Sequence, residues 1–216
     1  MRRPTILLTG GVALAGLTAY LLRHPVTSWG ATPQEVHDAL PGDEVIASPR
    51  YAATHAITID APPERVWPWI AQLGQGRGGL YSYDWLENLL GLDIHSLDHI
   101  DPALQDIAVG DEVRLVPDGM QPDLAFDVLR VEPPHLLLPG PGTPRSEAVA
   151  AGLPYPTWAF VLRDAGDGST RVIARFRSDF ESTLVNTLMN NIGLAPIHLL
   201  MERRMLLGIK ERAERT

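Results

Sequence analysis

The stretch "IDAPPERVWPWIAQLGQGRGGLYSYDWLENLLG", from Ile59 to Gly91, contains the strongest signals for the fold. Gly74, Gly76 and Gly79 have the spacing G-x-G-x-x-G, which binds a dinucleotide pyrophosphate when it follows a strand and opens a helix. Here a helical pattern precedes the glycines, so that context is missing. Glycine is also the residue that tolerates a positive φ in tight turns. The stretch therefore predicts two short helices joined by a glycine turn, and no nucleotide as a partner.

The ends of the two helices are marked by particular residues. Pro62 and Pro63 suit a first helical turn, and Pro68 is expected to kink the helix that they open. Ser82 is expected to cap the second helix, which ends at Gly91. The apolar side of this second helix consists of Trp85, Leu86, Leu89 and Leu90.

Strand patterns surround this helical stretch. Residues 51–60 alternate, with Tyr51, His55 and Ile59 on one face. Further strands are expected within 111–117, 123–131, 157–164 and 169–180, and residues 135–140 continue the meander. Asp167 and Gly168 form a hairpin turn. A long helix is expected from Pro196 to Arg215, and residues 181–195 are either a lid or an extension of it. This order predicts an α+β fold, with an antiparallel sheet around the last helix.

The composition excludes several classes of function. The chain has 216 residues, a formal net charge of −8 and no cysteine, so disulfides and thiolate chemistry are absent. Residues 1–24 carry three arginines and no acidic residue, so all 26 Asp and Glu side chains follow them. An acidic body of this kind argues against nucleic acid as a partner, because binding to phosphates needs a basic face.

The N-terminal segment has the pattern of a membrane anchor. Residues 5–22 contain no charge and would span about 27 Å as a helix, with arginines at both ends. Ala13-Leu14-Ala15 leaves open a cleaved signal peptide, and a buried helix is the other alternative. We expect a single-pass membrane protein, with the side of the membrane left open. The expected parts are an anchor (1–24), a linker (25–50) and a ligand-binding domain (51–216).

Three parts of the chain resemble the SRPBCC (START-like) superfamily, and in particular its uncharacterised bacterial members. They are the stretch quoted above with its continuation to Ser96, the strand "TWAFVLR" and the final "MERRMLLGIKERAE". The resemblance covers most of residues 45–215. It implies a helix-grip fold, in which a sheet wraps around the C-terminal helix and leaves a cavity for apolar ligands. Members of the superfamily include lipid-transfer proteins, hormone receptors and polyketide cyclases, so the fold does not decide the function.

Given that fold, a set of aromatic, methionine and histidine side chains is expected near the cavity. Such side chains suit an adaptable apolar site, although each of them could equally be part of the core. The expected ligand-binding residues are Tyr81, Tyr83, Trp85, Trp158, Phe160, His198, Met201 and Met205. His55 has the same ambiguity as His198, and no acidic partner for either is identified from the sequence.

Metal and cofactor sites receive little support from the motifs. Asp93, His95, Asp98, His99 and Asp101 form the densest group of possible ligands, but they lie in a predicted loop and match no established spacing. We therefore expect neither a metal nor a cofactor.

Three functions remain open. The first is a membrane-anchored domain that binds a small hydrophobic or amphipathic ligand, lipid-like or polyketide-like. The alternative is a cyclase or dehydratase that uses His198 with Tyr81 or Tyr83 as acid and base groups. A surface that binds another protein is the third.

Overall fold

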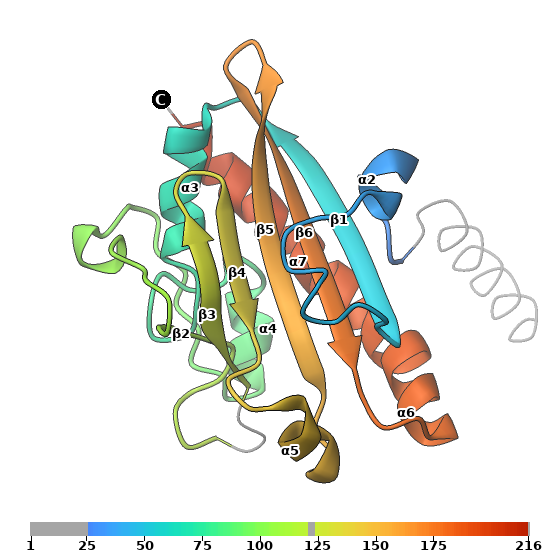
Figure 1. Ribbon diagram of the computed structural model, residues 1–216. Coiled ribbons are helices and arrows are strands. Elements are labelled where there is room, and N and C mark those ends of the chain that lie inside the picture. Colours follow the sequence, from blue (N-terminus) through green and yellow to red (C-terminus); the bar gives the residue numbers. More distant parts are fainter. Residues whose placement is uncertain (1–25, 121–123, 216) are drawn as a thin grey trace, which may run out of the picture.

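The computed structural model describes residues 26–120 and 124–215. Its centre is a six-stranded antiparallel sheet with the order β1-β6-β5-β4-β3-β2 (Figure 1). The strands are β1 (Tyr51–Ile59), β2 (Glu112–Arg114), β3 (Ala125–Glu132), β4 (Leu136–Gly140), β5 (Tyr155–Gly166) and β6 (Ser169–Asp179). The turn at Asp167 and Gly168 joins β5 and β6, as expected, and both residues have positive φ.

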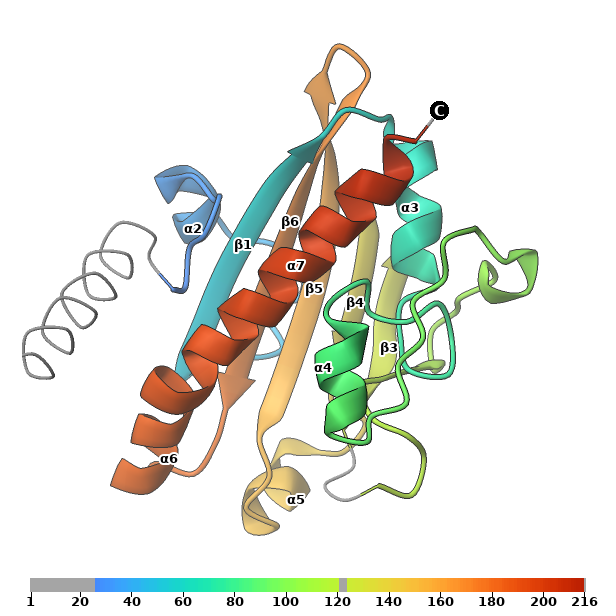
Figure 2. The ribbon, with the colours of Figure 1, turned by 180° about the vertical axis from the view of Figure 1, so that it is seen from behind.

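The inner face of the sheet packs against the C-terminal helix α7 (Ala195–Ala213), which crosses it diagonally (Figure 2). Val172 and Ala174 of β6 and Phe160 of β5 are fully buried there, together with Leu206 of α7. The predicted alternation of β6, with apolar residues opposite Arg171, Arg175 and Arg177, is therefore confirmed. The predicted helix-grip architecture is also confirmed in the part of the chain that the structure describes.

Other helical segments connect or extend this arrangement. The helix α3 (Pro63–Ala71) packs against α7 and contains Pro68 without ending there. The short helices α4 (Asp84–Leu89) and α5 (Arg145–Ala150) lie near one end of the sheet, and η1 (Pro102–Leu104) interrupts the loop before β2. Residues 184–194 form α6 (Leu184–Leu188) and the π-helical turn η2 (Met189–Leu194), which continue directly into α7. Of the two alternatives for residues 181–195, the structure shows an extension of the last helix.

The glycine stretch forms a closed loop between α3 and α4. The backbone amides of Gly74 and Gly79 each donate to the other residue's carbonyl oxygen over 3.0 Å. Gly79 has a φ of 80°, and a Cβ at this position would lie 2.5 Å from the Cα of Ser96. A larger residue would therefore push the loop away from Ser96. These glycines close a turn that packs against the segment around Ser96.

Residues 26–50 differ from the expected linker, because they pack along the outer face and edge of the sheet. The amides of Thr54 and Ala56 in β1 donate to the carbonyls of Thr27 and Trp29. After the short helix α2 (Pro33–His37), the side chains of Leu40 and Ile46 are buried. We call residues 26–50 the N-terminal arm. The composition of these residues suggested a linker. It carries no information about the contacts that hold the arm, because those contacts are made by β1 and β6.

The expected membrane anchor at residues 5–22 lies outside the described residues. Among residues 26–120 and 124–215, no helix is long and apolar enough to cross a bilayer.

Candidate functional site

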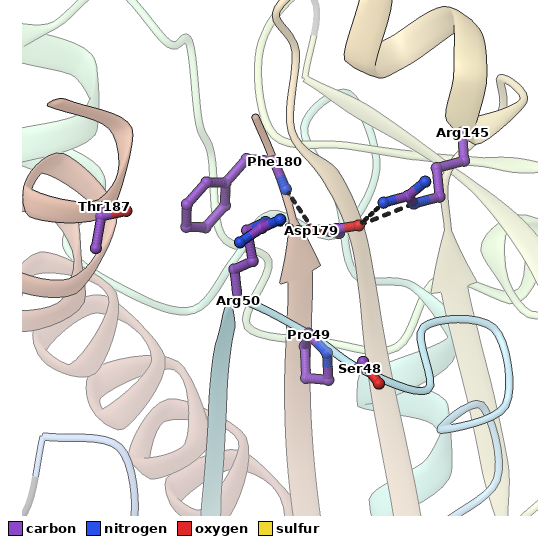
Figure 3. Close-up of a pocket in the computed structure, with 7 residues that line it drawn as sticks. All are labelled: Ser48, Pro49, Arg50, Arg145, Asp179, Phe180 and Thr187. Carbon is purple, nitrogen blue, oxygen red and sulfur yellow. Dashed lines mark hydrogen bonds and ion pairs between the residues drawn. The ribbon is translucent and has the colours of Figure 1, made fainter. Parts of the chain in front are cut away.

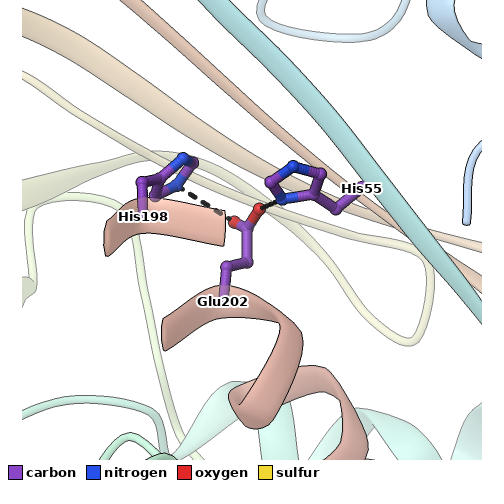
Figure 4. A group of neighbouring side chains, drawn as sticks. All are labelled: His55, His198 and Glu202. Carbon is purple, nitrogen blue, oxygen red and sulfur yellow. Dashed lines mark hydrogen bonds and ion pairs between the residues drawn. The ribbon is translucent and has the colours of Figure 1, made fainter. Parts of the chain in front are cut away.

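Two histidines and a glutamate from β1 and α7 meet beneath the sheet (Figure 4). His55 projects from the inner face of β1, and His198 and Glu202 lie one turn apart on α7. The carboxylate of Glu202 lies between the two imidazole rings, whose centroids are 5.5 Å apart. His55 and Glu202 are almost completely buried, while the side chain of His198 is 21% exposed. Among the described residues, the cluster is therefore open to solvent on the side of His198.

Glu202 is a buried carboxylate that is surrounded by donors. Trp158 Nε1 donates to Glu202 Oε1 over 2.5 Å, and His55 Nδ1 donates to Glu202 Oε2. Burial alone would raise the pKa of the Glu202 carboxyl, but the neighbouring His198 and His55 lower it well below its usual range. Glu202 is therefore ionised in the folded protein.

Each ring nitrogen of His55 faces a hydrogen-bond acceptor on another residue. Its Nδ1 faces Glu202, and its Nε2 lies 2.9 Å from the carbonyl oxygen of Val26. An imidazole between a carboxylate and a carbonyl donates from both nitrogens only when it is protonated. Burial opposes this charge, but the hydrogen bond that His55 donates to Glu202 and the negative charge of Glu202 raise the pKa of His55. The structure thus contains a buried imidazolium–carboxylate pair.

His198 occupies the open side of the cluster. Its Nδ1 lies 3.3 Å from the hydroxyl of Tyr51, and its Nε2 lies 3.6 Å from Glu202 Oε1. This Nε2 atom is buried and has no hydrogen-bond partner in the described part of the chain. Burial, together with the charge of Glu202, raises the pKa of Tyr51 to about 12, so its hydroxyl stays protonated.

The residues expected near a cavity fall into two groups. Trp158, Phe160, His198 and Met205 lie around or beside the cluster on the inner face of the sheet, and Met201 is half-buried on the same helix. The ring of Trp158 packs at a tilt against that of Phe160, with a centroid distance of 4.7 Å. Phe160 and Met205 are fully packed core residues, which is the alternative that the sequence left open for them.

The aromatic residues after the glycines lie elsewhere. Tyr81 is buried in the core, where its hydroxyl accepts from Gln72 Nε2 over 2.9 Å and its ring packs against Trp69. Tyr83 is half-buried at the start of α4, and the side chain of Trp85 is 70% exposed. His198 therefore pairs with Tyr51 rather than with Tyr81, which was one of its two expected acid–base partners.

The expected cap of α4 is wrong. Ser82 does not cap this helix, because its hydroxyl donates to the carbonyl of Met201. Helix α4 begins at Asp84, whose carboxylate accepts from the amide and the hydroxyl of Ser96. The predicted apolar side of α4 is largely solvent-exposed at Trp85 and Leu89.

Glu202 is the central residue that the sequence analysis missed. Its signal was the spacing of four residues from His198, which places both side chains on one face of a helix. The spacing alone does not show that a buried strand histidine completes the cluster. That juxtaposition depends on how α7 lies across β1.

The loop that carries Asp93, His95, Asp98 and His99 holds exposed surface pairs. His95 contacts Asp93, and His99 contacts Asp98, with all four side chains at least 65% exposed. The structure thus gives this loop no enclosed ligand set.

A second feature is a polar cleft of about 530 Å³ at the end of the sheet (Figure 3). It is lined by Ser48, Pro49, Arg50, Arg145, Asp179, Phe180 and Thr187. Arg145 Nε donates to Asp179 Oδ2 over 2.8 Å, and Arg50 Nε lies 3.2 Å from Asp179 Oδ1. Two arginines share one aspartate, so one positive charge remains without a counterion among the lining residues.

No family model and no curated protein matches this chain. Solved structures that it resembles include a truncated norcoclaurine synthase from Thalictrum flavum (TM-score 0.46, 15% identity, 77% of this chain and 94% of that chain). Others are protein MLL2253 from Mesorhizobium loti (TM-score 0.43, 17% identity, 77% and 98%) and the Aha1 dimer from Colwellia psychrerythraea (TM-score 0.42, 16% identity, 76% and 96%). Similarity at this level supports no transfer of activity, ligand or partner.

The topology of the described residues identifies the fold directly. A six-stranded antiparallel sheet grips a long C-terminal helix, and two short helical segments follow the first strand. The described residues thus form the helix-grip fold that the resemblance to the START-like superfamily implies.

Proposed function

We propose that this protein is a membrane-anchored domain that binds an amphipathic ligand with an anionic head group. The observation that carries the proposal is the cleft of about 530 Å³ with the two arginines Arg50 and Arg145. Guanidinium groups bind carboxylate and phosphate oxygens through paired hydrogen bonds. The side chains of Arg50 and Arg145 are 45% and 61% exposed, so their free donors are accessible to a ligand.

An apolar surface lies beside this cleft. Thr187 of α6 lines the cleft, and the same helical segment exposes many large apolar side chains. They are Leu184, Val185, Leu188, Met189, Ile192, Leu194, Ile197 and Leu200. We call this set the helical apolar face. Exposed patches of this kind mark sites of contact with membranes, ligands or other proteins. A head group at the arginines would place an attached apolar tail along this face.

The position of the chain's N-terminal end favours the membrane as the occupant of the helical apolar face. Val26, the first described residue, packs with Phe180 and with Ala195 at the start of α7. The uncharged segment of residues 5–22 precedes Val26 in the sequence, so an anchor formed by it would be joined to the domain beside Ala195, within the stretch that carries the face. An anchor in the bilayer would hold this end close to the lipid surface. We propose that the ligand is taken from or delivered to that surface.

Ligand binding is tested with the full chain in detergent micelles, using oleate and the uncharged oleyl alcohol as probes. We expect oleate to bind at least about tenfold more tightly, because charge-assisted hydrogen bonds form with the arginines. The double variant R50A/R145A should lose this preference. Arg130, whose side chain has an exposure similar to that of Arg50, provides the matched control R130A. Equal binding of the two probes, or an unchanged preference in the double variant, would overturn the proposal.

The orientation at the membrane is tested by single cysteines, because the chain has none of its own. Ile192 and Val109 are 66% and 65% exposed, and only Ile192 lies on the helical apolar face. An environment-sensitive fluorophore on I192C should shift to the blue when the full chain is reconstituted into phosphatidylcholine vesicles. The same fluorophore on V109C should remain in water. Identical spectra at both positions would contradict the orientation.

A further inference from the structure

We infer that the cluster of His55, His198 and Glu202 is a binding site for a divalent first-row transition metal ion. Two imidazoles and one carboxylate are a donor set that Zn²⁺ and related ions use, with a fourth position left for another ligand. One ligand atom from each residue lies within 4.8 Å of the others. The inference is independent of the proposed ligand cleft and goes beyond it.

The spacing of one pair of donor atoms, on His198 and Glu202, suits a metal ion. Ligand atoms of a tetrahedral zinc ion lie roughly 3.4 Å from one another, given bonds of about 2.0–2.1 Å. His198 Nε2 and Glu202 Oε1 are 3.6 Å apart, which is too long for a hydrogen bond. The buried His198 Nε2 atom has no other partner within the described residues, so its lone pair or proton is left unused. A metal ion between these atoms would give His198 Nε2 the partner that it lacks, and Glu202 Oε1 would keep its hydrogen bond from Trp158 Nε1.

Each of the three side chains also has a second contact that orients it. His55 Nε2 donates to the carbonyl of Val26, His198 Nδ1 meets the Tyr51 hydroxyl, and Glu202 Oε1 accepts from Trp158 Nε1. Metal-binding histidines characteristically use their second nitrogen in this way, and ligating carboxylates are likewise held by a donor. The cluster therefore has the outer contacts of a metal site as well as its ligands.

The hydrogen-bonded pair of His55 and Glu202 is compatible with this assignment. A metal ion requires a lone pair on His55 Nδ1, so it would replace the proton that this atom shares with Glu202. The bond from Nε2 to Val26 would remain. Access is from the side of His198, because His55 and Glu202 have 0% and 1% side-chain exposure. The fourth ligand would also enter from that side.

The test uses the full chain, purified without a polyhistidine tag, treated with a chelator and titrated with Co²⁺. We expect one equivalent to bind, with the visible absorption of four- or five-coordinate Co²⁺, and Zn²⁺ to displace it. The variant H198A should weaken binding by at least about tenfold. His198 is the most exposed of the three residues, so this variant should retain the fold. The control H95A, in the exposed loop, should bind as the wild type does.

Tyr51→Phe separates metal binding from a purely structural role. It removes only the hydroxyl that orients His198 and should lower Co²⁺ affinity by about tenfold. Circular dichroism and thermal unfolding of each variant exclude loss of the fold as the cause. The inference is overturned if the wild type binds no Co²⁺, if H198A binds as tightly as the wild type, or if H95A abolishes binding instead.

Discussion

The two faces of the sheet are held to their neighbours by different forces. The inner face packs on α7 through fully buried apolar side chains, such as Phe160, Val172 and Leu206. The outer face also has an apolar cluster, with Leu40 of the N-terminal arm over Ile173. The arm is also held by three arginines of β6, which bind its carbonyl and carboxylate oxygens.

Arg175 shows how this second attachment works. Its side chain is 4% exposed and donates to Asp43 Oδ2, to Thr54 Oγ1 and to the carbonyl of Asp38. Arg177 similarly donates to the carbonyl of Ile46. Apolar burial depends little on pH and salt, whereas ionic contacts depend on both. Acid or high salt is therefore expected to loosen the arm before it affects the inner core.

The largest effect is expected on the inner face, from Leu206→Ala. Leu206 is completely buried between α7 and the sheet, so its truncation leaves a cavity and should cost about 3–4 kcal/mol in the free energy of unfolding. Urea unfolding measures this loss. Leu200→Ala on the same helix is the matched control, because Leu200 is 47% exposed and should change stability by less than about 0.5 kcal/mol. Equal losses in both variants would contradict the assignment of the core.

An intermediate effect is expected on the outer face, from Arg175→Met. The substitution leaves Asp43 and several arm carbonyls without their buried donor, at a cost of about 2–3 kcal/mol. Hydrogen exchange should accelerate at the amides of residues 27–46 more than at those of α7. The control R130M removes an exposed arginine that contacts Glu132, and it should leave exchange in the arm unchanged. Uniform acceleration throughout the domain would show that the arm and the core unfold together.

The smallest effect is expected from acid, through Glu35 of the arm. Its hydrogen bond to Arg171, opposed by burial, lowers the pKa of the Glu35 carboxyl to about 2. A carboxyl with a lowered folded-state pKa stabilises the protein above its ordinary value of 4.5, and this contribution is lost as the pH falls from about 4.5 to 2. The loss should amount to roughly 1–2 kcal/mol and should appear first as faster exchange in the arm. In Glu35→Gln this pH dependence should vanish, and its persistence would assign it to another group.

The sequence predicted the features that depend on local patterns. Alternation along β6 placed Val172 and Arg175 on opposite faces, and the hydrophobic pattern located α7 to within two residues at each end. Proline and glycine marked the start of α3 and the turn at Gly74. These patterns reflect a backbone period or a conformational preference, so they can be read without knowledge of the partners.

The remaining features depend on contacts between distant segments. Residues 26–50 are polar and rich in turns, and the contacts that pack them on the sheet come from β1 and from the arginines of β6. Trp85 and Leu89 belong to the predicted apolar side of α4, yet both side chains are largely exposed in the described part of the chain. The role of Glu202 could not be predicted, because its partner His55 is 147 residues away in the sequence and meets it only in the folded structure. Helical or strand periodicity gives no information about such pairs.

Val26 links the buried cluster to the start of the N-terminal arm. Its carbonyl accepts from His55 Nε2, and its side chain packs against the group that contains Phe180 and Ala195. The next carbonyl, that of Thr27, accepts from the backbone amide of Thr54. A substitution of His55 is therefore expected to loosen the first residues of the arm as well as the cluster itself.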